Sequence, residues 1–307
     1  MSVYTRVDRT QLEHFLQDYP LGQLLSYTGI EDGIENSNYL LTTTQGDFVL
    51  TLFEWFSERQ LGYFLRLLQH LQRADFPCPE PQADNNSKII NTLAAKPAAI
   101  FKRIAGSSVS IPTVSNCQQV GTHLAQLHGS GQNFPVHRAN SMDLRWCYQM
   151  AEKIKPRLKP ADYSKIRAEL EFQTAYSQAK LPQGLIHGDL FKDNVLFDNG
   201  KLSGVLDFYN ACHDPLLLDL AITANDWSHE QGGQINREKL DSLIESYQQT
   251  RALTGIELQL LPVMLRASAL RFWLSRLEHQ LFPRAGELTQ EKDPALYRYI
   301  LEQHQTL

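Results

Sequence analysis

The segment of the chain most informative about chemistry spans residues 185–197 and has the sequence LIHGDLFKDNVLF. It holds a histidine, an aspartate and an asparagine in the order H-x-D-x-x-x-x-N, between two apolar stretches. The second stretch turns back through the residues DNG at 198–200, a hairpin signal, into a further apolar run that reaches Asp207. Because a hairpin brings its two ends together, we expect Asp207 to lie beside the loop that carries Asp189 and Asn194.

These side chains fit the needs of phosphoryl transfer, which depends more on positioning and charge neutralisation than on covalent chemistry. One carboxylate must orient the attacking hydroxyl and accept its proton, and Asp189 is the candidate. Asp207 and Asn194 offer the hard oxygen ligands that Mg²⁺ prefers. His187 is interpreted as a brace that forms hydrogen bonds within the loop. The competing interpretation is a surface hairpin with ordinary polar loop residues.

The elements that must position this loop divide the chain near residues 104–106. Residues 1–104 predict a small strand-rich lobe, with helices behind Asp8 and at 58–74 and strands at 23–30, 38–43, 48–53, 88–92 and 98–104. Residues 105–307 predict a mainly helical lobe, with helices from a capping box at Ser115 and Gln118, at about 143–158 and 161–179, and beyond the hairpin. The fold class is therefore α+β. Two independent domains fit this pattern equally well.

Composition excludes several classes of protein. The 307 residues carry 29 lysines and arginines against 34 acidic side chains, a net charge of −5, so we expect no general attraction to nucleic acid or to an anionic membrane. The four cysteines are widely spaced and contain no CxxC, which disfavours zinc and disulfides and predicts buried, reduced thiols. No apolar stretch is long enough to span a membrane, and the first thirty residues lack an export signal, so we expect a cytoplasmic protein.

The segments HGDLFKDN and LDF resemble the catalytic and metal loops of the aminoglycoside phosphotransferase and choline kinase superfamily, which has a bilobal protein-kinase-like fold. GIENSNY at 33–39, FVLTLFE at 48–54 and ANDW at 224–227 are more narrowly similar to bacterial homoserine kinases. That family transfers the γ-phosphoryl group of ATP to the hydroxyl of L-homoserine, a step toward threonine. The resemblance implies a kinase that uses ATP and Mg²⁺, with residues 1–104 as nucleotide-binding lobe and 105–307 as catalytic and acceptor-binding lobe.

The same resemblance assigns the nucleotide contacts. The turn at 33–39 would cover the phosphates with backbone N–H groups, and the strand at 98–104 would end in the hinge that binds adenine. The resulting cofactor-binding candidates are Gly33, Asn36, Ser37, Asn38, Thr51, Phe101 and Lys102. Asp219 would accept hydrogen bonds beneath the catalytic loop. Without the resemblance, the turn has a single glycine and is equally well explained as an ordinary hairpin loop.

Thr51 is a departure from the kinase pattern. Kinase-like folds usually carry a lysine at this place in the third strand, where it pairs with the α- and β-phosphates. Threonine cannot supply that charge, so Mg²⁺, loop amides or a cation such as Lys102 or Arg103 must do so. The alternative is a non-catalytic nucleotide-binding pseudokinase. Because the three catalytic and metal-binding candidates are all present, the sequence favours an active enzyme.

The short connection after Asp207 favours a small acceptor. Residues 208–213 leave no room for the activation segment on which protein kinases order a peptide. From Asp207 to Glu230 there are five acids and no lysine or arginine, a pattern that suits an ammonium group. Asp226, with Tyr209 and Trp227 as cation–π surfaces, is therefore a substrate-binding candidate. The tryptophan is also well explained as a core residue.

The acceptor's carboxylate calls for an arginine, its natural bidentate partner. A late helix at 265–281 has one apolar stripe, which consists of Leu270, Trp273, Leu274, Leu277 and Leu281. Arg266 falls on this stripe, whereas Arg271 and Arg276 fall away from its centre. An arginine on an apolar face needs a partner, so we hypothesise that Arg266 points into the acceptor site. A salt bridge or a snorkelling stem is the alternative.

The sequence thus favours phosphorylation of L-homoserine to O-phospho-L-homoserine. The alternatives are a related kinase that acts on choline, a sugar or an aminoglycoside, and the pseudokinase described above. The oligomeric state is not indicated by any pattern in the chain.

Overall fold

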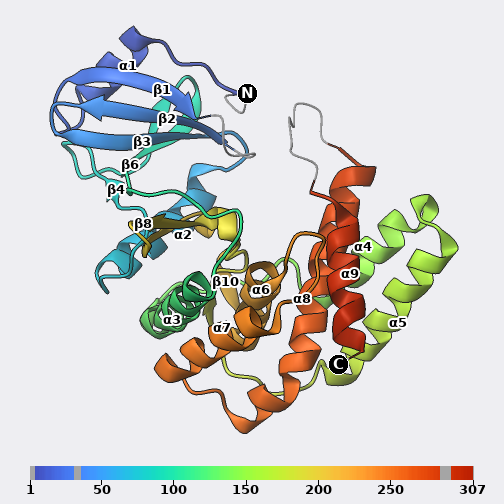
Figure 1. Cartoon of the computed structure of the whole chain (residues 1–307). Helices are drawn as coiled ribbons and strands as arrows, with labels where there is room; N and C mark the ends of the chain where they lie inside the picture. The colour runs from blue at the N-terminus through green and yellow to red at the C-terminus, as the bar shows by residue number, and fades with distance from the viewer. Residues whose placement is uncertain (1–3, 31–35, 284–291, 307) are drawn as a thin grey trace. The chain divides into compact units, whose positions relative to one another are not determined.

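The computed structural model describes residues 4–30, 36–283 and 292–306. These residues form two compact units. The first comprises the described residues up to 105 together with 204–206, and the second comprises the others. Figure 1 draws most of the first unit in blue and teal, and most of the second in green, orange and red.

The first unit is built on a six-stranded sheet, with the strand order β1-β2-β3-β6-β4 and β5 also paired to β6. All of its pairs are antiparallel. The strands are β1 (Leu24–Ile30), β2 (Asn36–Thr43), β3 (Gly46–Phe53), β4 (Pro81–Gln82), β5 (Asn91–Leu93) and β6 (Lys96–Lys102). The helices are α1 (Arg9–Leu16), capped by Asp8 as expected, and α2 (Glu58–Gln72).

Alternation along the strands gives this sheet two different faces. One face packs against α1 in a continuous core, whose members include Leu12, Phe15, Leu16, Tyr39, Leu41, Phe48, Leu50, Leu52 and Ile100. Successive side chains of a strand point to opposite faces, and paired residues share a face. Asn38 and Thr51, which are paired, therefore lie on the face away from that core, together with Phe101, which pairs with Val49.

One strand of this unit differs from the expectation. The sequence predicted a strand at 88–92, but β5 covers only Asn91–Leu93. The Asp84 carboxylate accepts hydrogen bonds from the backbone N–H groups of Asn86 and Lys88, at 2.9 and 2.8 Å. This local turn uses backbone groups that a longer strand would need.

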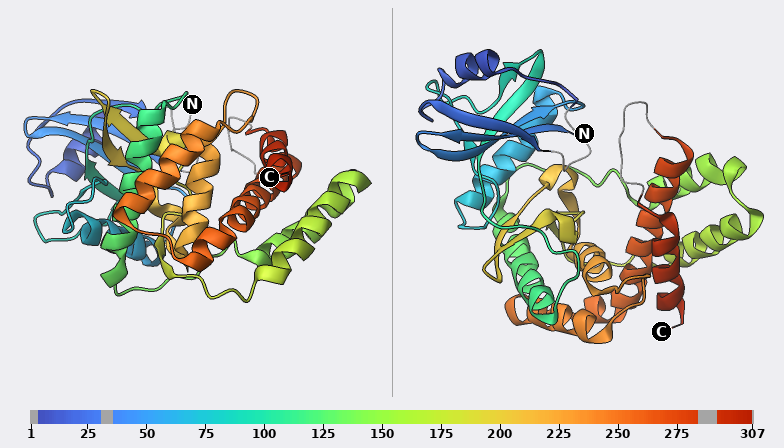
Figure 2. Two further views of the ribbon diagram at one scale, coloured as in Figure 1. Left: turned by 60° about the horizontal axis from the view of Figure 1, so that its bottom comes forward. Right: turned by 45° about the horizontal axis from the view of Figure 1, so that its top comes forward.

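The second unit is mainly helical (Figure 2). Its helices are α3 (Val114–Ser130), α4 (Leu144–Ile154), α5 (Pro160–Tyr176), α6 (Leu216–Ser228), α7 (Arg237–Thr250), α8 (Gly255–Leu281) and α9 (Pro294–Gln305). Two short antiparallel pairs complete it: β7 (Gln183–Ile186) with β10 (Cys212–Pro215), and the hairpin β8 (Val195–Asp198) with β9 (Lys201–Val205). The last two residues of β9 are grouped with the first unit. The expected α+β class, with a small β-rich part and a larger helical part, is confirmed.

Helix α8 lies at the centre of the second unit. It contacts α4, α5, α6 and α9, and its residues 268–274 are all buried. The helix also begins ten residues before the predicted segment at 265–281, at a capping box formed by Thr254 and Glu257. A single apolar stripe is therefore a poor description of α8, because partners surround it.

Helices α3 and α7 lie side by side in Figures 1 and 2 and are in extensive contact. A Cβ atom at Gly121 of α3 would collide with the carbonyl oxygen of Leu243 and would also meet the backbone nitrogen of Tyr247. Glycine is thus required at this crossing. The predicted start of α3 was wrong: the capping box uses Thr113 and Asn116 rather than the next such pair along the chain, Ser115 and Gln118.

The expectation of reduced thiols is confirmed, since all four cysteines are buried and free. Burial raises the pKa of the Cys117 thiol to about 11 and the pKa values of the Cys78, Cys147 and Cys212 thiols to about 12. These thiols therefore stay protonated at neutral pH. Within the described ranges, no helix is both long and apolar enough to cross a bilayer.

Candidate active site

The loop predicted to carry the chemistry connects β7 to β8. Gly188 follows β7 with a φ of +77°, a conformation that glycine adopts without a steric penalty. After the β8–β9 hairpin, Asp207 has a φ of +58°, which is unusual for a residue with a side chain. Its carboxylate caps the short turn Phe208–Asn210 by accepting a hydrogen bond from the Tyr209 N–H at 3.5 Å. Left-handed backbone conformations therefore occur at the residue before Asp189 and at Asp207 itself.

The structure brings Asp189, Asn194 and Asp207 together. The Asn194 carboxamide donates a hydrogen bond to the Asp189 carbonyl oxygen at 2.9 Å, and the Asn210 carboxamide donates to the Asp189 carboxylate at 3.4 Å. Burial, followed by the negative charge of Asp207, raises the pKa of Asp189 well above its ordinary value. A carboxylate with a raised pKa is a stronger proton acceptor, as a general base requires.

The same neighbourhood suits a magnesium ion chemically. Asn194 donates its amide N–H to the loop, so its carboxamide oxygen is the atom it can offer to a cation. Asp207 adds a carboxylate whose charge repels that of Asp189, and a divalent cation would relieve this repulsion. Within the described part of the chain, no group of three or more His, Cys, Asp or Glu side chains forms a metal site. Two protein oxygens with water and phosphate ligands are typical of magnesium rather than zinc.

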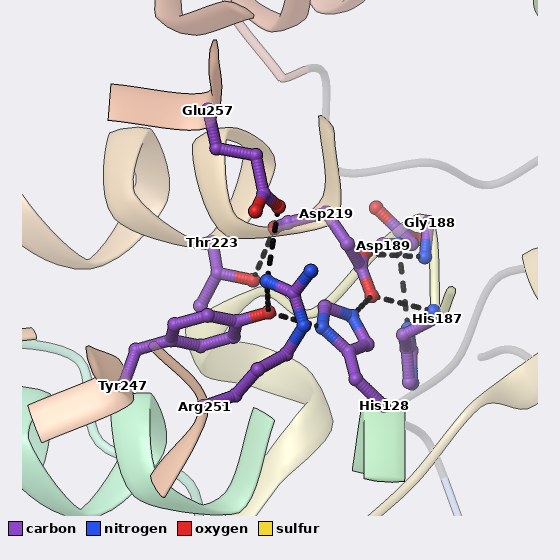
Figure 3. A network of polar contacts seen from close by, with 9 residues as sticks. All are labelled: His128, His187, Gly188, Asp189, Asp219, Thr223, Tyr247, Arg251 and Glu257. Carbon is purple, nitrogen blue, oxygen red and sulfur yellow. Dashed lines mark hydrogen bonds and ion pairs between the residues drawn. The ribbon is translucent and has the colours of Figure 1, made fainter. Parts of the chain in front are cut away.

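Asp219 of α6 lies beneath the catalytic loop and is fully buried (Figure 3). Its carboxylate accepts hydrogen bonds from the backbone N–H groups of His187 and Gly188, at 2.7 and 2.8 Å, and lies 3.1 Å from His128 Nε2. Burial alone would raise the pKa of Asp219, but the hydrogen bond from His128 and its other donors hold the pKa below its ordinary value. Asp219 therefore remains ionised and anchors the loop backbone.

His187 also stabilises the loop from within. Its Nδ1 accepts a hydrogen bond from the Asp189 N–H at 3.3 Å, and its ring packs against Phe208 at 4.7 Å between centroids. These contacts are those of a brace, the role that the sequence analysis gave it.

A buried polar network extends from Asp219 to the far side of α7 (Figure 3). His128 Nδ1 lies 2.7 Å from the Tyr247 hydroxyl, and Arg251 donates to that hydroxyl at 3.1 Å. Arg251 also pairs at 2.9 Å with Glu257, whose side chain is fully buried. Glu257 in turn caps the start of α8. The network thus ties α3, α6, α7 and α8 to the loop.

The donors in this network determine its direction. Arginine only donates, so the Tyr247 oxygen accepts from Arg251 and its O–H must donate to His128 Nδ1. His128 is then protonated on Nε2 and donates to Asp219. The positive charge of Arg251 and the negative charge of Asp219 therefore lie at opposite ends of one chain of hydrogen bonds.

Arg266 does not point into an acceptor site. Its guanidinium forms a bidentate ion pair with the buried Glu169, the shortest contact being 2.6 Å, and its Cζ atom lies 3.4 Å from the centroid of the Phe172 ring. The structure therefore contains the salt bridge that was the alternative interpretation. The position of Arg266 on the apolar stripe was misleading, because Glu169 of α5 supplies a carboxylate to that face of α8.

The other acceptor candidates are mostly buried under the loop. Trp227 is fully buried and donates its indole N–H to the Leu190 carbonyl at 3.0 Å. It is therefore a core residue, which was the alternative interpretation from the sequence. The Asp226 carboxylate is 3% exposed and accepts a hydrogen bond from the Lys192 N–H at 2.8 Å. Tyr209 is half-buried in the turn after Asp207. Contact of these residues with an acceptor stays a prediction.

The nucleotide candidates that the structure describes belong to the first unit. Thr51 donates its hydroxyl to the Asn38 carboxamide at 2.8 Å on the sheet face that also carries Phe101. Ser37 instead donates to the buried Glu54 carboxylate at 2.6 Å, a structural contact. Asn36 opens β2 and is 6% exposed, and the side chain of Lys102 is exposed at the end of β6. Gly33 lies outside the described residues.

Two cations near the loop were missed by the sequence analysis. Lys292 lies 2.9 Å from the Asp193 carboxylate, and its charge acts on Asp189. Arg271, placed away from the apolar stripe, is 4% exposed and donates to the Gly188 carbonyl at 3.1 Å. No local motif marks either residue, because each is far from the loop in sequence.

Comparison with known proteins identifies the family of this protein. The sequence model described as "Phosphotransferase enzyme family" matches residues 26–253. The chain belongs to this phosphotransferase family. Among curated relatives, it is 42% identical over 302 residues to the homoserine kinase of Methylobacillus flagellatus, which covers 98% of this chain and 95% of the relative. It is 40% identical over 301 residues to the homoserine kinase of Brucella ovis, with 97% and 92% covered.

Solved phosphotransferases have the same fold at low sequence identity. The amicoumacin kinase in complex with AMP-PNP, Ca²⁺ and its antibiotic has a TM-score of 0.72 at 16% identity, covering 98% of this chain and 94% of that one. Spectinomycin phosphotransferase in complex with ADP and spectinomycin has a TM-score of 0.74 at 13% identity, covering 99% and 100%. These likenesses confirm the protein-kinase-like fold of this phosphotransferase family member.

Proposed function

We propose that this protein is a homoserine kinase, which transfers the γ-phosphoryl group of ATP to the side-chain hydroxyl of L-homoserine. The products are O-phospho-L-homoserine and ADP, and the reaction is a step of threonine biosynthesis. The observation that carries this proposal is the likeness to homoserine kinases over nearly the full length of both proteins. The catalytic loop supports it, since it holds the groups that phosphoryl transfer requires.

In this proposal, Asp189 is the catalytic base. Its carboxylate accepts a hydrogen bond from the acceptor hydroxyl, orients the oxygen toward the γ-phosphorus and takes the proton as the new oxygen–phosphorus bond forms. The bond between the γ-phosphorus and the β–γ bridging oxygen breaks, and ADP leaves. The raised pKa of Asp189, caused by burial and by Asp207, favours this proton transfer.

Asn194 and Asp207 would hold Mg²⁺. When bound, the ion would neutralise charge on the nucleotide phosphates. His187 and Asp219 would keep the loop backbone in place, because both form hydrogen bonds with it.

ATP binding would involve the first unit. The proposed contacts are the sheet face of Asn38, Thr51 and Phe101, with the main chain at the end of β6 near Lys102. Thr51 carries no charge, so another group must compensate for the lysine of other kinases. We further propose that the enzyme acts in the cytoplasm, as expected for a biosynthetic kinase.

The test is an ADP-release assay of the purified protein with MgATP and a panel of acceptors: L-homoserine, choline, a hexose and an aminoglycoside. We expect turnover with L-homoserine, and a phosphomonoester on its side-chain oxygen by ³¹P NMR. Turnover of choline but not homoserine would assign the chain to another member of the family. Thermal stabilisation by ATP without turnover of any acceptor would favour the pseudokinase.

A further inference from the structure

Arg271 is a buried cation beside the catalytic loop that the mechanism above does not use. It lies in the part of α8 where every residue from 268 to 274 is buried, and its side chain is 4% exposed. One guanidinium nitrogen, Nη2, donates to the carbonyl oxygen of Gly188, the residue before Asp189. The positive charge of Arg271 therefore contacts the backbone of the residue next to the proposed base, Asp189.

The rest of this guanidinium lacks hydrogen-bond partners. Among the described residues, neither Nε nor Nη1 of Arg271 has an acceptor, although both atoms are buried. The charge of Arg271 acts on Asp189 and on Asp214, but neither carboxylate accepts a hydrogen bond from these two nitrogens. Buried guanidinium N–H groups are costly without an acceptor, so a position of this kind calls for an anionic partner.

Arg266, on the same helix, shows what a fully paired arginine looks like in this protein. Its Nε and Nη2 both donate to the Glu169 carboxylate, which is the bidentate geometry that guanidinium groups favour. Among the described residues, Arg271 has no carboxylate in that position, and its buried Nε and Nη1 lack an acceptor. The partner is therefore expected from outside the described chain.

We propose that Arg271 binds the carboxylate of the acceptor and so selects an amino acid over a simple amino alcohol. This inference rests on the proposed function and deepens it. L-Homoserine carries its hydroxyl and its carboxylate at the two ends of a short carbon chain. A group that binds the carboxylate must therefore lie close to the base, as Arg271 does through Gly188. The bound carboxylate supplies the acceptor that the unpaired nitrogens lack.

The experiment compares L-homoserine with 3-aminopropan-1-ol, which is homoserine without its carboxylate. For the wild-type enzyme we expect kcat/KM to be at least ~100-fold higher with L-homoserine, because a site built to bind a polar group rejects an analogue that lacks it. In Arg271→Ala, this preference should fall to within about tenfold, mainly through a higher KM for homoserine, since uniform binding is lost. Equal losses of kcat with both acceptors would overturn the proposal and leave Arg271 as a support of the loop.

Arg266→Ala is the matched control, since it removes an arginine from the same helix. Any effect should fall equally on both acceptors and leave the preference intact. If Arg271→Ala does not fold, Arg271→Lys replaces it in the experiment, because lysine retains the positive charge but lacks the paired donors of a guanidinium group. We then expect the KM for homoserine to rise by about tenfold. An unchanged homoserine KM in a folded Arg271→Lys variant would overturn the proposal. Wild-type enzyme without homoserine turnover would instead reject the proposed function itself.

Discussion

Two carboxylates of the candidate site, the partly exposed Asp189 and the fully buried Asp219, have opposite properties. Burial and the charge of Asp207 raise the pKa of Asp189, whereas hydrogen-bond donors hold the pKa of Asp219 below its ordinary value. Burial acts on both groups in the same direction. The difference arises because Asp219 receives two backbone N–H groups and His128, while Asp189 receives one long hydrogen bond from a side chain.

The comparison indicates that hydrogen-bond donors at Asp219, and the charge of Asp207 beside Asp189, set the opposite directions of the two pKa shifts. Asp219 has its lone pairs occupied by the loop and serves as an anchor. Asp189 keeps lone pairs for a reacting hydroxyl and a raised affinity for its proton. The anchor, Asp219 of α6, and the proposed base, Asp189 of the loop, are thus of the same residue type, and substitution should separate their roles.

The largest effect is expected from Asp189→Asn. The change keeps the shape of the side chain but removes its ability to accept a proton, so kcat should fall by roughly 10³–10⁴-fold. At neutral pH the melting temperature should not fall, because the folded protein stabilises the protonated form of this group relative to the unfolded chain. Asp193→Asn, an exposed neighbour paired with Lys292, is the control and should lower kcat by less than about fivefold. A marked loss of stability in Asp189→Asn would make it an anchor as well.

Asp219→Asn should act mainly on stability. It removes a buried charge whose three donors then face an amide, at a cost of about 3–5 kcal/mol in the free energy of unfolding. Chemical denaturation would measure this. Asp162→Asn, which removes a half-buried ion pair with Arg298, should cost no more than about 1 kcal/mol. Similar costs for the two variants would contradict the anchor role.

Acidification should reduce the stability that the Asp219 carboxylate contributes to the folded protein. Because the pKa of Asp219 is lowered by folding, its contribution is fully present above the pKa of the unfolded chain and is lost as pH falls through the lowered folded value. Denaturation of wild type and Asp219→Asn between about pH 5 and pH 2 should therefore show the two free energies of unfolding converging. Parallel curves would mean that the carboxylate charge contributes nothing.

The smallest effect is expected from Tyr247→Phe. This variant removes the hydroxyl that links Arg251 to His128 and should cost about 1–2 kcal/mol, because a buried donor and a buried acceptor each lose a partner. A melting curve would measure the cost, and kinetics would show whether the loss reaches the loop. Unchanged stability would mean that water replaces the hydroxyl.

The proximity of the three candidate residues was predictable from sequence because they lie close together along the chain. The motif at 187–194 and the hairpin after it place Asp189, Asn194 and Asp207 by local geometry alone. Most strands and most helices followed from periodicity. The start of α3 was misplaced because two overlapping residue pairs, Thr113–Asn116 and Ser115–Gln118, both fit a capping box.

The remaining contacts depend on packing between distant segments. Arg271 was dismissed because the stripe argument assumes that a helix buries one side, and α8 is buried on all sides over residues 268–274. The pairing of Arg266 with Glu169 joins positions 97 residues apart, and that of His128 with Tyr247 joins positions 119 apart. No periodicity within either segment contains that information.

The bare backbone of Gly121 has a consequence for how this enzyme tolerates mutation. The helix that carries His128 can approach the helix that carries Tyr247 only because no side chain stands between them at that crossing. A single added methyl group there would push the two apart, lengthen the link to Asp219 and loosen the backbone that presents Asp189. Gly121 lies at a helix crossing outside the catalytic loop, yet catalysis should be nearly as sensitive to it as to the polar groups it brings within reach.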